Sequence, residues 1–188
     1  PVPTAAGTMG NGGVLTGGSK LAEQKITAVT TPGYGTVDAV QQLDKTTWSN
    51  YRGWFMDYTA IGERQLKPIE FYDGSNILAV YSQVPARGSN TTQTGESCNT
   101  TTALPERQFR TFINIMDGKR PTVQLVDMTG DGQFTAADLG VSHAEVSGGS
   151  HTIVTQGNRN VDIDQNNKLE KLNRMPEQSL RPSWRQLK

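Results

Sequence analysis

Residues Asn76-Ile-Leu-Ala-Val-Tyr-Ser-Gln-Val84 decide the fold class of this chain. The middle of the stretch is continuously apolar and Pro85 follows it, which favours a short buried strand, because proline cannot continue a hydrogen-bonded ladder. Further strand candidates lie on both sides of it, at 25–31, 36–40, 53–58 and 109–116. Turn signals such as Pro32-Gly33 and Asp117-Gly118 separate these stretches, and helical periodicity is almost absent. The sequence therefore predicts a mainly β fold.

A second stretch, Asp127-Met-Thr-Gly-Asp-Gly-Gln-Phe-Thr-Ala-Ala-Asp138, has the spacing of a calcium-binding loop. Calcium is a hard cation that takes roughly six to eight oxygen ligands, and this spacing places oxygen donors around one point. Gly132 stands at position 6 of the loop, where the backbone has to turn sharply. The predicted ligands are Asp127, Thr129, Asp131, the backbone carbonyl of Gln133, Thr135 acting through water, and Asp138. The alternative is an aspartate- and glycine-rich turn that binds no ion.

The last predicted ligand, Asp138, is one methylene shorter than the glutamate of calcium sensors, so we expect a structural site rather than a switching one. A similar stretch, Asp162-Ile-Asp-Gln-Asn-Asn-Lys168, starts like another calcium loop but has Asn167 at position 6 and Asn173 at position 12. Asparagine cannot supply the bidentate carboxylate of that last position, so a solvent-exposed loop is expected here. Short helical turns are expected at 136–139 and 168–173.

The chain divides by composition into three parts. Residues 1–20 are rich in glycine, proline and alanine and are expected to be a flexible lead-in. Residues 21–160 are expected to form a β-rich domain, and 161–188 an irregular C-terminal tail. Within the domain, 91–102 is polar and contains Cys98, which predicts an exposed loop. In the tail, Trp184 is expected either to pack on the domain's own sheet or to dock a partner.

Composition excludes several classes of function. Of the 188 residues, 18 are Lys or Arg and 18 are Asp or Glu, so no net charge draws the chain to nucleic acid or to an anionic membrane. No apolar run approaches the roughly 20 residues of a transmembrane helix. Cys98 is the only cysteine, which rules out a disulfide within the chain. Because the chain begins at Pro1, without a Met or a signal peptide, we expect a fragment of a longer, exported precursor.

Catalytic chemistry is not expected. His143 and His151 are the only histidines, and neither lies in a nucleophile motif such as Gly-x-Ser-x-Gly. No carboxylate pair stands at the end of a candidate strand in a way that suggests glycoside hydrolysis. A binding or structural module is therefore the leading hypothesis. The alternatives are a dockerin-like, calcium-dependent interaction module and a fragment of a secreted hydrolase that calcium stabilises.

Several segments follow one another in a recognisable order, from Leu21-Ala-Glu-Gln-Lys-Ile-Thr27 to Arg52-Gly-Trp-Phe-Met-Asp57, Gly62-Glu-Arg64, Ser82-Gln-Val-Pro85, Cys98, the loop from Asp127 and finally Ser183-Trp-Arg-Gln-Leu187. In this order the chain resembles the carboxy-terminal part of the type IV pilus tip proteins, the PilC/PilY adhesin and assembly family. The match spans residues 21–188, and its most specific parts are the Gly-Trp and Gly-Glu-Arg block and the Ser-Trp-Arg-Gln-Leu terminus.

The resemblance implies a β-propeller-type region or a terminal β-sheet domain. It implies minor pilins of the pilus tip as partners, and host or abiotic surface receptors as adhesion targets. It also implies an extracellular location at the pilus tip, after export through the periplasm. The predicted function is then a calcium-binding structural and adhesive module for pilus assembly and surface attachment, with Ca2+ as its cofactor.

Overall fold

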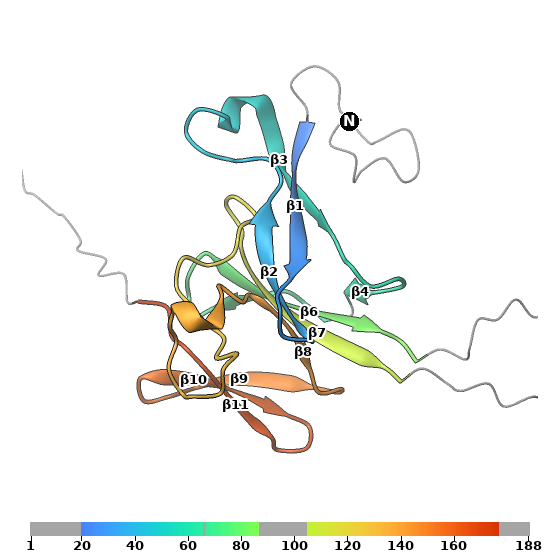
Figure 1. The fold of residues 1–188 in the computed structure, drawn as a ribbon, viewed down its shortest axis with the longest axis vertical. Coiled ribbons are helices and arrows are strands. Elements are labelled where there is room, and N and C mark those ends of the chain that lie inside the picture. Colours follow the sequence, from blue (N-terminus) through green and yellow to red (C-terminus); the bar gives the residue numbers. More distant parts are fainter. Residues whose placement is uncertain (1–19, 66, 87–104, 177–188) are drawn as a thin grey trace, which may run out of the picture.

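The computed structural model describes residues 20–65, 67–86 and 105–176, and these form a mainly β structure (Figure 1). The strands are β1 (Lys20–Ala28), β2 (Tyr34–Ala39), β3 (Tyr51–Asp57), β4 (Arg64–Gln65), β5 (Glu70–Tyr72), β6 (Ile77–Val84), β7 (Arg107–Asn114), β8 (His143–Val146), β9 (His151–Gln156), β10 (Arg159–Asp164) and β11 (Leu169–Leu172). Short 3-10 helices lie at η2 (Trp48–Asn50) and η3 (Ala136–Asp138). The predicted fold class, mainly β, is confirmed.

The strands of the described residues form two sheets. The main sheet has eight strands in the order β3-β1-β2-β8-β7-β6-β4, with β5 also pairing with β6. Its neighbours are antiparallel except β1 and β3, which run parallel, and it curls into a half-barrel (Figure 1). The small sheet has the order β11-β10-β9 and lies against one end of the main sheet. The propeller implied by the family resemblance is not shown by the described strands.

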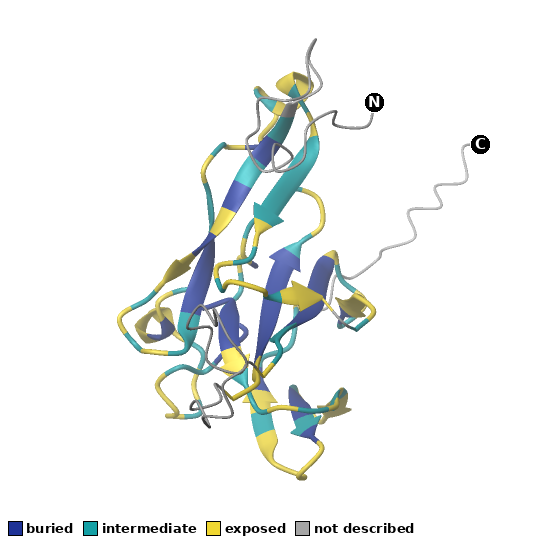
Figure 2. Cartoon of the chain, turned by 90° about the vertical axis from the view of Figure 1, so that its right-hand side faces the viewer, coloured by how far each residue is buried: buried dark blue, intermediate teal, exposed yellow. Residues whose placement is uncertain are grey.

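Strand β6 explains why the predicted strand at 76–84 is so continuously apolar. All its residues from Ile77 to Ser82 are buried, which requires cover on both of its faces. Figure 2 shows such buried residues gathered on the strands in the middle of the molecule. Ile77, Ala79 and Tyr81 belong to one hydrophobic cluster, while Leu78 and Val80 belong to a second. The other candidate strands at 25–31, 36–40, 53–58 and 109–116 overlap β1, β2, β3 and β7.

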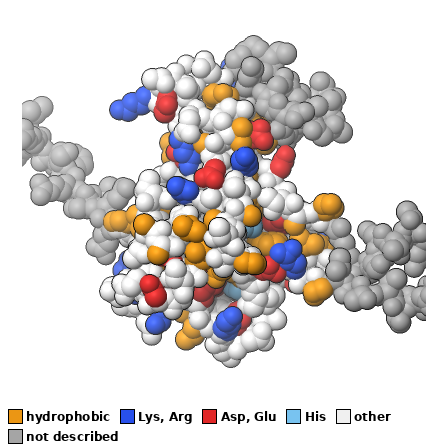
Figure 3. Space-filling model, viewed as in Figure 1, with side chains coloured by type: hydrophobic (Ala, Val, Ile, Leu, Met, Phe, Trp, Pro, Cys, Tyr) orange, Lys and Arg blue, Asp and Glu red, His pale blue; other side chains and the backbone are white. Residues whose placement is uncertain are grey.

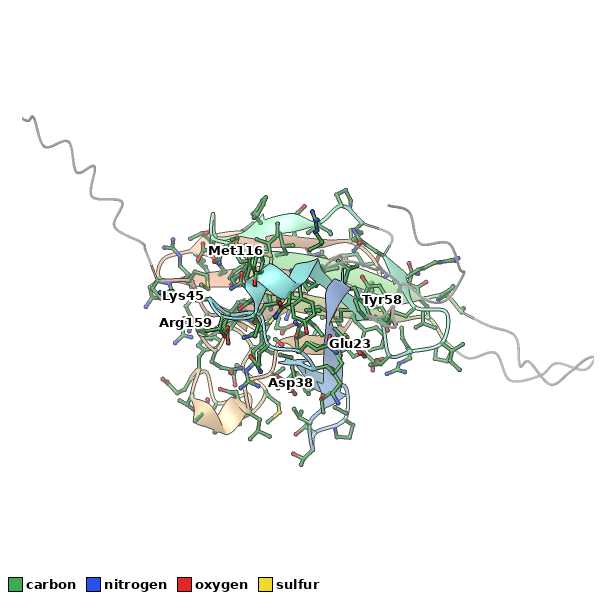
Figure 4. All side chains as sticks on the ribbon, turned by 90° about the horizontal axis from the view of Figure 1, so that it is seen from above. Glu23, Asp38, Lys45, Tyr58, Met116 and Arg159 are labelled. Carbon is green, nitrogen blue, oxygen red and sulfur yellow. The ribbon has the colours of Figure 1, made fainter. Side chains whose placement is uncertain are left out.

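Side chains of β3 and of the residue just after it cover one of the two hydrophobic clusters. Trp54, Met56 and Tyr58 pack against the second hydrophobic cluster. Figure 4, seen from above, labels Tyr58 just after β3 and Glu23 on the neighbouring strand β1. The Trp54 indole N–H also donates to the carbonyl of Ile115, at 2.9 Å, which ties β3 to the turn that follows β7. That turn was predicted from Asp117-Gly118, and the prediction is confirmed.

The segment before the aspartate loop joins the two sheets. Val126 forms an isolated antiparallel bridge with Leu172 of β11, and both side chains are buried in the first cluster. The amide N–H of Asn173 donates to the carbonyl of Leu125 at 3.0 Å. The end of β11 therefore fixes the point at which the aspartate loop begins.

Two expectations for the end of the chain are wrong. Residues 168–173, expected as a helical turn, contain β11, and the expected irregular tail contains β10 and β11 up to Leu172. Leu169 and Leu172 have helical spacing, but pairing with β10 outweighs this local preference. The stretch from Asp162 to Lys168 is an exposed loop only in part: Asp162 and Asp164 lie buried on β10, whereas residues 165–168 form an exposed turn. The helical turn at 136–139 is confirmed by η3.

Several expectations lie outside the described residues. They concern the lead-in at 1–19, the loop at 91–102 with Cys98, and the tail from 177 onward with Trp184. In the described ranges, none of the helical segments has the length and apolar character that a bilayer crossing requires. Figure 3 shows basic and acidic side chains interspersed over the displayed face, as the balanced composition predicts.

Candidate functional site

The aspartate loop (127–138) closes on its own backbone at its start. The two carboxylate oxygens of Asp127 accept hydrogen bonds from the amides of Gly130 and Gly132, each at 2.7 Å. Gly132 has a φ of 77°, in the left-handed region that favours glycine. The sharp turn predicted at position 6 of the loop is therefore present.

The end of the loop is tied back to its beginning. Thr135 caps η3, and the Asp138 side chain accepts from the Thr135 amide at 2.8 Å, which makes a capping box. The other oxygen of Asp138 accepts from the amides of Met128 and Thr129, at 2.9 and 3.2 Å. Asp138 is fully buried. The side chains at positions 1 and 12 of the loop thus both accept hydrogen bonds from backbone amides between residues 128 and 135.

Three of the predicted ligands come together and the others lie farther out. The Thr129 hydroxyl is 3.3 Å from an Asp127 oxygen and 3.4 Å from an Asp138 oxygen. Asp131 is exposed and accepts from the amide of Gln133 at 2.7 Å. Gln133 and Thr135 are exposed as well. Within the described ranges, no group of three or more His, Cys, Asp or Glu side chains is arranged so that it could hold a metal ion.

The donor chemistry of the loop nevertheless fits a hard cation. Every predicted ligand offers an oxygen, and a carboxylate has about four acceptor positions, of which the loop amides use only some. Asp131 at the surface has an oxygen to which no amide is bonded among the described residues. An ion here would draw Asp131 toward the oxygens of Asp127 and Asp138.

A buried charge cluster, formed by Arg110, His151, Asp162 and Glu170, lies where the two sheets meet. Arg110 of β7 has a side chain that is 0% exposed, and it donates to Asp162 of β10 and, at 2.6 Å, to Glu170 of β11. The Tyr81 hydroxyl of β6 donates to Asp162 at 3.3 Å. The cluster therefore connects β6 and β7 of the main sheet with β10 and β11 of the small one.

Charge pairing decides the protonation states of this cluster. Burial lowers the pKa of the Arg110 guanidinium, but the charges and hydrogen bonds of Glu170 and Asp162 outweigh burial and raise it above its ordinary value. Burial raises the pKa of Asp162, but the bonds from His151 and Arg110 outweigh it and lower the pKa. Both groups are charged at neutral pH. Burial, as the main cause, raises the pKa of the Tyr81 phenol, which stays neutral.

A pocket of about 200 Å³ opens beside this cluster. Five of its eleven lining residues are carboxylates, and Tyr34 and Lys168 lie among them. The acidic lining residues are Asp127, Glu145, Asp162, Asp164 and Glu170. Asp127 is therefore both the first residue of the aspartate loop and part of the wall of the pocket beside the charge cluster.

A larger pocket, of about 310 Å³, lies across strands β1, β2, β8 and β7. Its lining includes Phe109, Arg107 and His143, which is 5% exposed. The His143 Nδ1 lies 2.9 Å from the Thr111 hydroxyl, and its ring stacks on Phe109 at a centroid distance of 5.0 Å. Burial is the main cause that lowers the pKa of His143, to about 4, so this histidine is neutral at pH 7.

The sequence had singled out the aspartate loop but not the charge cluster. A signal was present on both strands, because Arg110 interrupts the apolar stretch Phe109-Arg-Thr-Phe-Ile113, and Asp162 and Asp164 alternate with apolar residues on β10. A charged residue in a strand of that kind requires a partner of opposite charge. Nothing in one sequence indicates which partner it is.

A scan against protein-family models finds no matching family, and searches of curated proteins and of solved structures find no match.

Proposed function

We propose that this chain is a calcium-binding structural and adhesive module from the carboxy-terminal region of a type IV pilus tip protein of the PilC/PilY family. In this function it takes part in pilus assembly and in surface attachment, outside the cell at the pilus tip. Its partners are minor pilins and the receptors on host or abiotic surfaces. The proposal starts from the order of segments that resembles this family, from Leu21 to Leu187.

The observation that carries the calcium part of the proposal is the convergence of loop positions 1, 3 and 12. These three residues come from both ends of the loop, yet one carboxylate oxygen of Asp127 and one of Asp138 lie 3.3 and 3.4 Å from the Thr129 hydroxyl. Asp131 and the carbonyl of Gln133 complete the proposed ligand set, and Thr135 acts through water. Bound calcium would neutralise the carboxylates and hold the loop closed.

The position of the loop suggests a structural role for the ion. Val126 immediately precedes the loop and pairs with Leu172 of the small sheet. A loop that an ion holds closed would therefore also keep the junction of the two sheets in place. A propeller or terminal-sheet arrangement in the parent protein remains part of this proposal. The described residues form strands and short 3-10 turns, which favours this reading over a helical, dockerin-like module.

We expect calorimetry to detect one calcium ion per chain, with binding lost or weakened at least about tenfold in Asp131→Asn. The substituted amide oxygen can still accept the hydrogen bond from Gln133, so the loop keeps its turn while it loses one charge. Glu70→Gln, which removes an exposed carboxylate on β5, is the matched control and should bind calcium like the unaltered chain. No heat of binding in the unaltered chain, or equal affinity in Asp131→Asn, would contradict the assignment of the ion.

The pilus part of the proposal has a separate test. Antibodies raised against this chain should label the ends of sheared type IV pili, and the purified chain with calcium should co-purify with purified minor pilins. Asp131→Asn should reduce co-purification, whereas Glu70→Gln should not. Label only on the cell body, together with no association with any minor pilin, would overturn the pilus assignment even if calcium binds.

A further inference from the structure

His151 is placed where the connection from the main sheet enters the small sheet. It is the first residue of β9 and follows the connection 147–150, and its side chain is only 3% exposed. Its ring stacks on Tyr81 of β6, with centroids 5.3 Å apart and an angle of 25° between the rings. The imidazole therefore lies between the two sheets, with little access to water.

Both ring nitrogens of His151 face groups that can only accept a hydrogen bond. Nδ1 lies 3.0 Å from a carboxylate oxygen of Asp162, and Nε2 lies 2.8 Å from the backbone carbonyl of Ser147. A neutral imidazole carries one N–H, whereas an imidazolium carries two. Only the doubly protonated ring satisfies both contacts, and this conclusion follows from the identity of the partners alone.

We propose that His151 is a proton-dependent link between the sheets. Its protonated ring, on β9, donates hydrogen bonds both to Asp162 and to Ser147, and loss of one proton releases the 147–150 connection. The proton that remains is expected on Nδ1, because the bond to a carboxylate is charge-assisted and the bond to a carbonyl is not. The contact that breaks is therefore the one with the Ser147 carbonyl.

The release is local, because other contacts hold the same connection. The Ser147 hydroxyl donates to Asp164 at 2.6 Å, and the Lys67 ammonium donates to the carbonyl of Gly149 at 2.6 Å. Neither contact includes the imidazole. The main effect of deprotonation is thus on the backbone of 147–150 and on the first residues of β9, and the sheets themselves stay folded.

Charged and titratable groups surround His151 on every element that packs against it. They are Asp162 and Asp164 on β10, Tyr81 on β6, Arg110 on β7, Glu170 on β11 and Lys67 between β4 and β5. Asp127, Glu145 on β8 and Lys168 line the same pocket as His151. Arg110 and Lys67 disfavour a second positive charge, but Glu170 offsets much of the charge of Arg110. The hydrogen bond with Asp162 is the main cause that raises the pKa of His151, while burial opposes it.

The direction of the pH effect follows from that raised pKa. The stabilisation by the protonated ring is fully present below the ordinary histidine pKa of about 6.5 and is lost as the pH rises through the higher pKa of the folded protein. Mildly alkaline solution therefore loosens the connection and mildly acidic solution fastens it. His143 responds in the opposite direction and serves as an internal reference.

Nitrogen-15 NMR of the unaltered full chain tests the protonation state without any substitution. At about pH 6 both ring nitrogens of His151 should carry protons, and the ring should titrate above about 6.5, whereas His143 should titrate well below it. A neutral His151 ring at about pH 6, or a pKa at or below 6.5, would overturn the proposal.

Hydrogen exchange tests the consequence for the backbone. After correction for intrinsic rates, the opening constants of the 147–151 amides should rise between about pH 6 and about pH 9, by at most about tenfold for each unit by which the pKa of His151 exceeds 6.5, because the bond to Asp162 persists in the opened connection. His151→Gln, which can donate to Asp162 at any pH, should abolish this rise, and His143→Phe should keep it. Absence of the rise in the unaltered chain, or its persistence in His151→Gln, would show that His151 does not control the connection.

Discussion

Replacing Arg110 with methionine is expected to lower the free energy of unfolding by roughly 3–5 kcal/mol. Methionine fills a similar volume, so the loss comes mainly from charge. Asp162, whose side chain is 1% exposed, would keep its negative charge in the interior with only His151 left as a cationic partner. Glu170 would lose a partner too, but it is 40% exposed and can turn to water. Guanidinium or urea unfolding at pH 7 measures the change.

A matched substitution exists three residues earlier on the same strand. Arg107 makes a bidentate pair with Glu145, at 2.9 and 2.7 Å, but the two side chains are 46% and 36% exposed. Arg107→Met should therefore cost no more than about 1 kcal/mol, since water screens an exposed pair. If Arg110→Met costs no more than Arg107→Met, the charge cluster does not hold the two sheets together.

The double variant Arg110→Met with Asp162→Asn separates lost charge pairing from lost packing. The cluster is incompletely satisfied, because within the described residues Arg110 Nε and one oxygen of Asp162 have no hydrogen-bond partner. Removing both charges therefore should recover a large part of the loss seen in Arg110→Met alone. A double variant as unstable as the sum of the two single ones would indicate that the two residues act independently.

The contrast between β6 and β7 explains how far a sequence predicts this fold. β6 is covered on both faces, so its apolar run identifies it without knowledge of its neighbours. β7 carries Arg110, which looks like a surface residue until Asp162 and Glu170, more than fifty positions away, are brought to it. Local pattern identifies strands, whereas the pairing of buried charges depends on the packing of two sheets.

The aspartate loop and the end of the chain show the same limit. The turn at Gly132 and the 3-10 helix after Thr135 follow from spacing and capping rules, and both were predicted. The sequence did not predict that Asp138 would be fully buried and bonded to three backbone amides. β11 was not predicted: its leucines have helical spacing, and only its pairing with β10 makes it a strand.

Acid is expected to weaken the fold through His143. Its pKa is lowered to about 4 by burial, so the folded protein binds fewer protons than the unfolded one between about pH 4 and 6.5. The stability that the neutral ring provides is complete above about pH 6.5 and is lost as the pH falls through about 4. Between about pH 8 and about pH 4.5 the loss assigned to this one group is about 2–3 kcal/mol.

His143→Phe isolates this effect, because phenylalanine keeps the stacking on Phe109 but cannot titrate. The Thr111 hydroxyl loses its partner in the variant, which lowers stability by about 1–3 kcal/mol, equally at every pH. The two proteins should therefore differ in slope: the unaltered chain loses more stability in acid than His143→Phe does, and the curves approach each other near pH 4.5. His151 acts in the opposite sense in both proteins, so it cancels from the difference. Parallel curves would mean that His143 does not titrate with a lowered pKa, and that the pocket beside it admits enough water to solvate the charged ring.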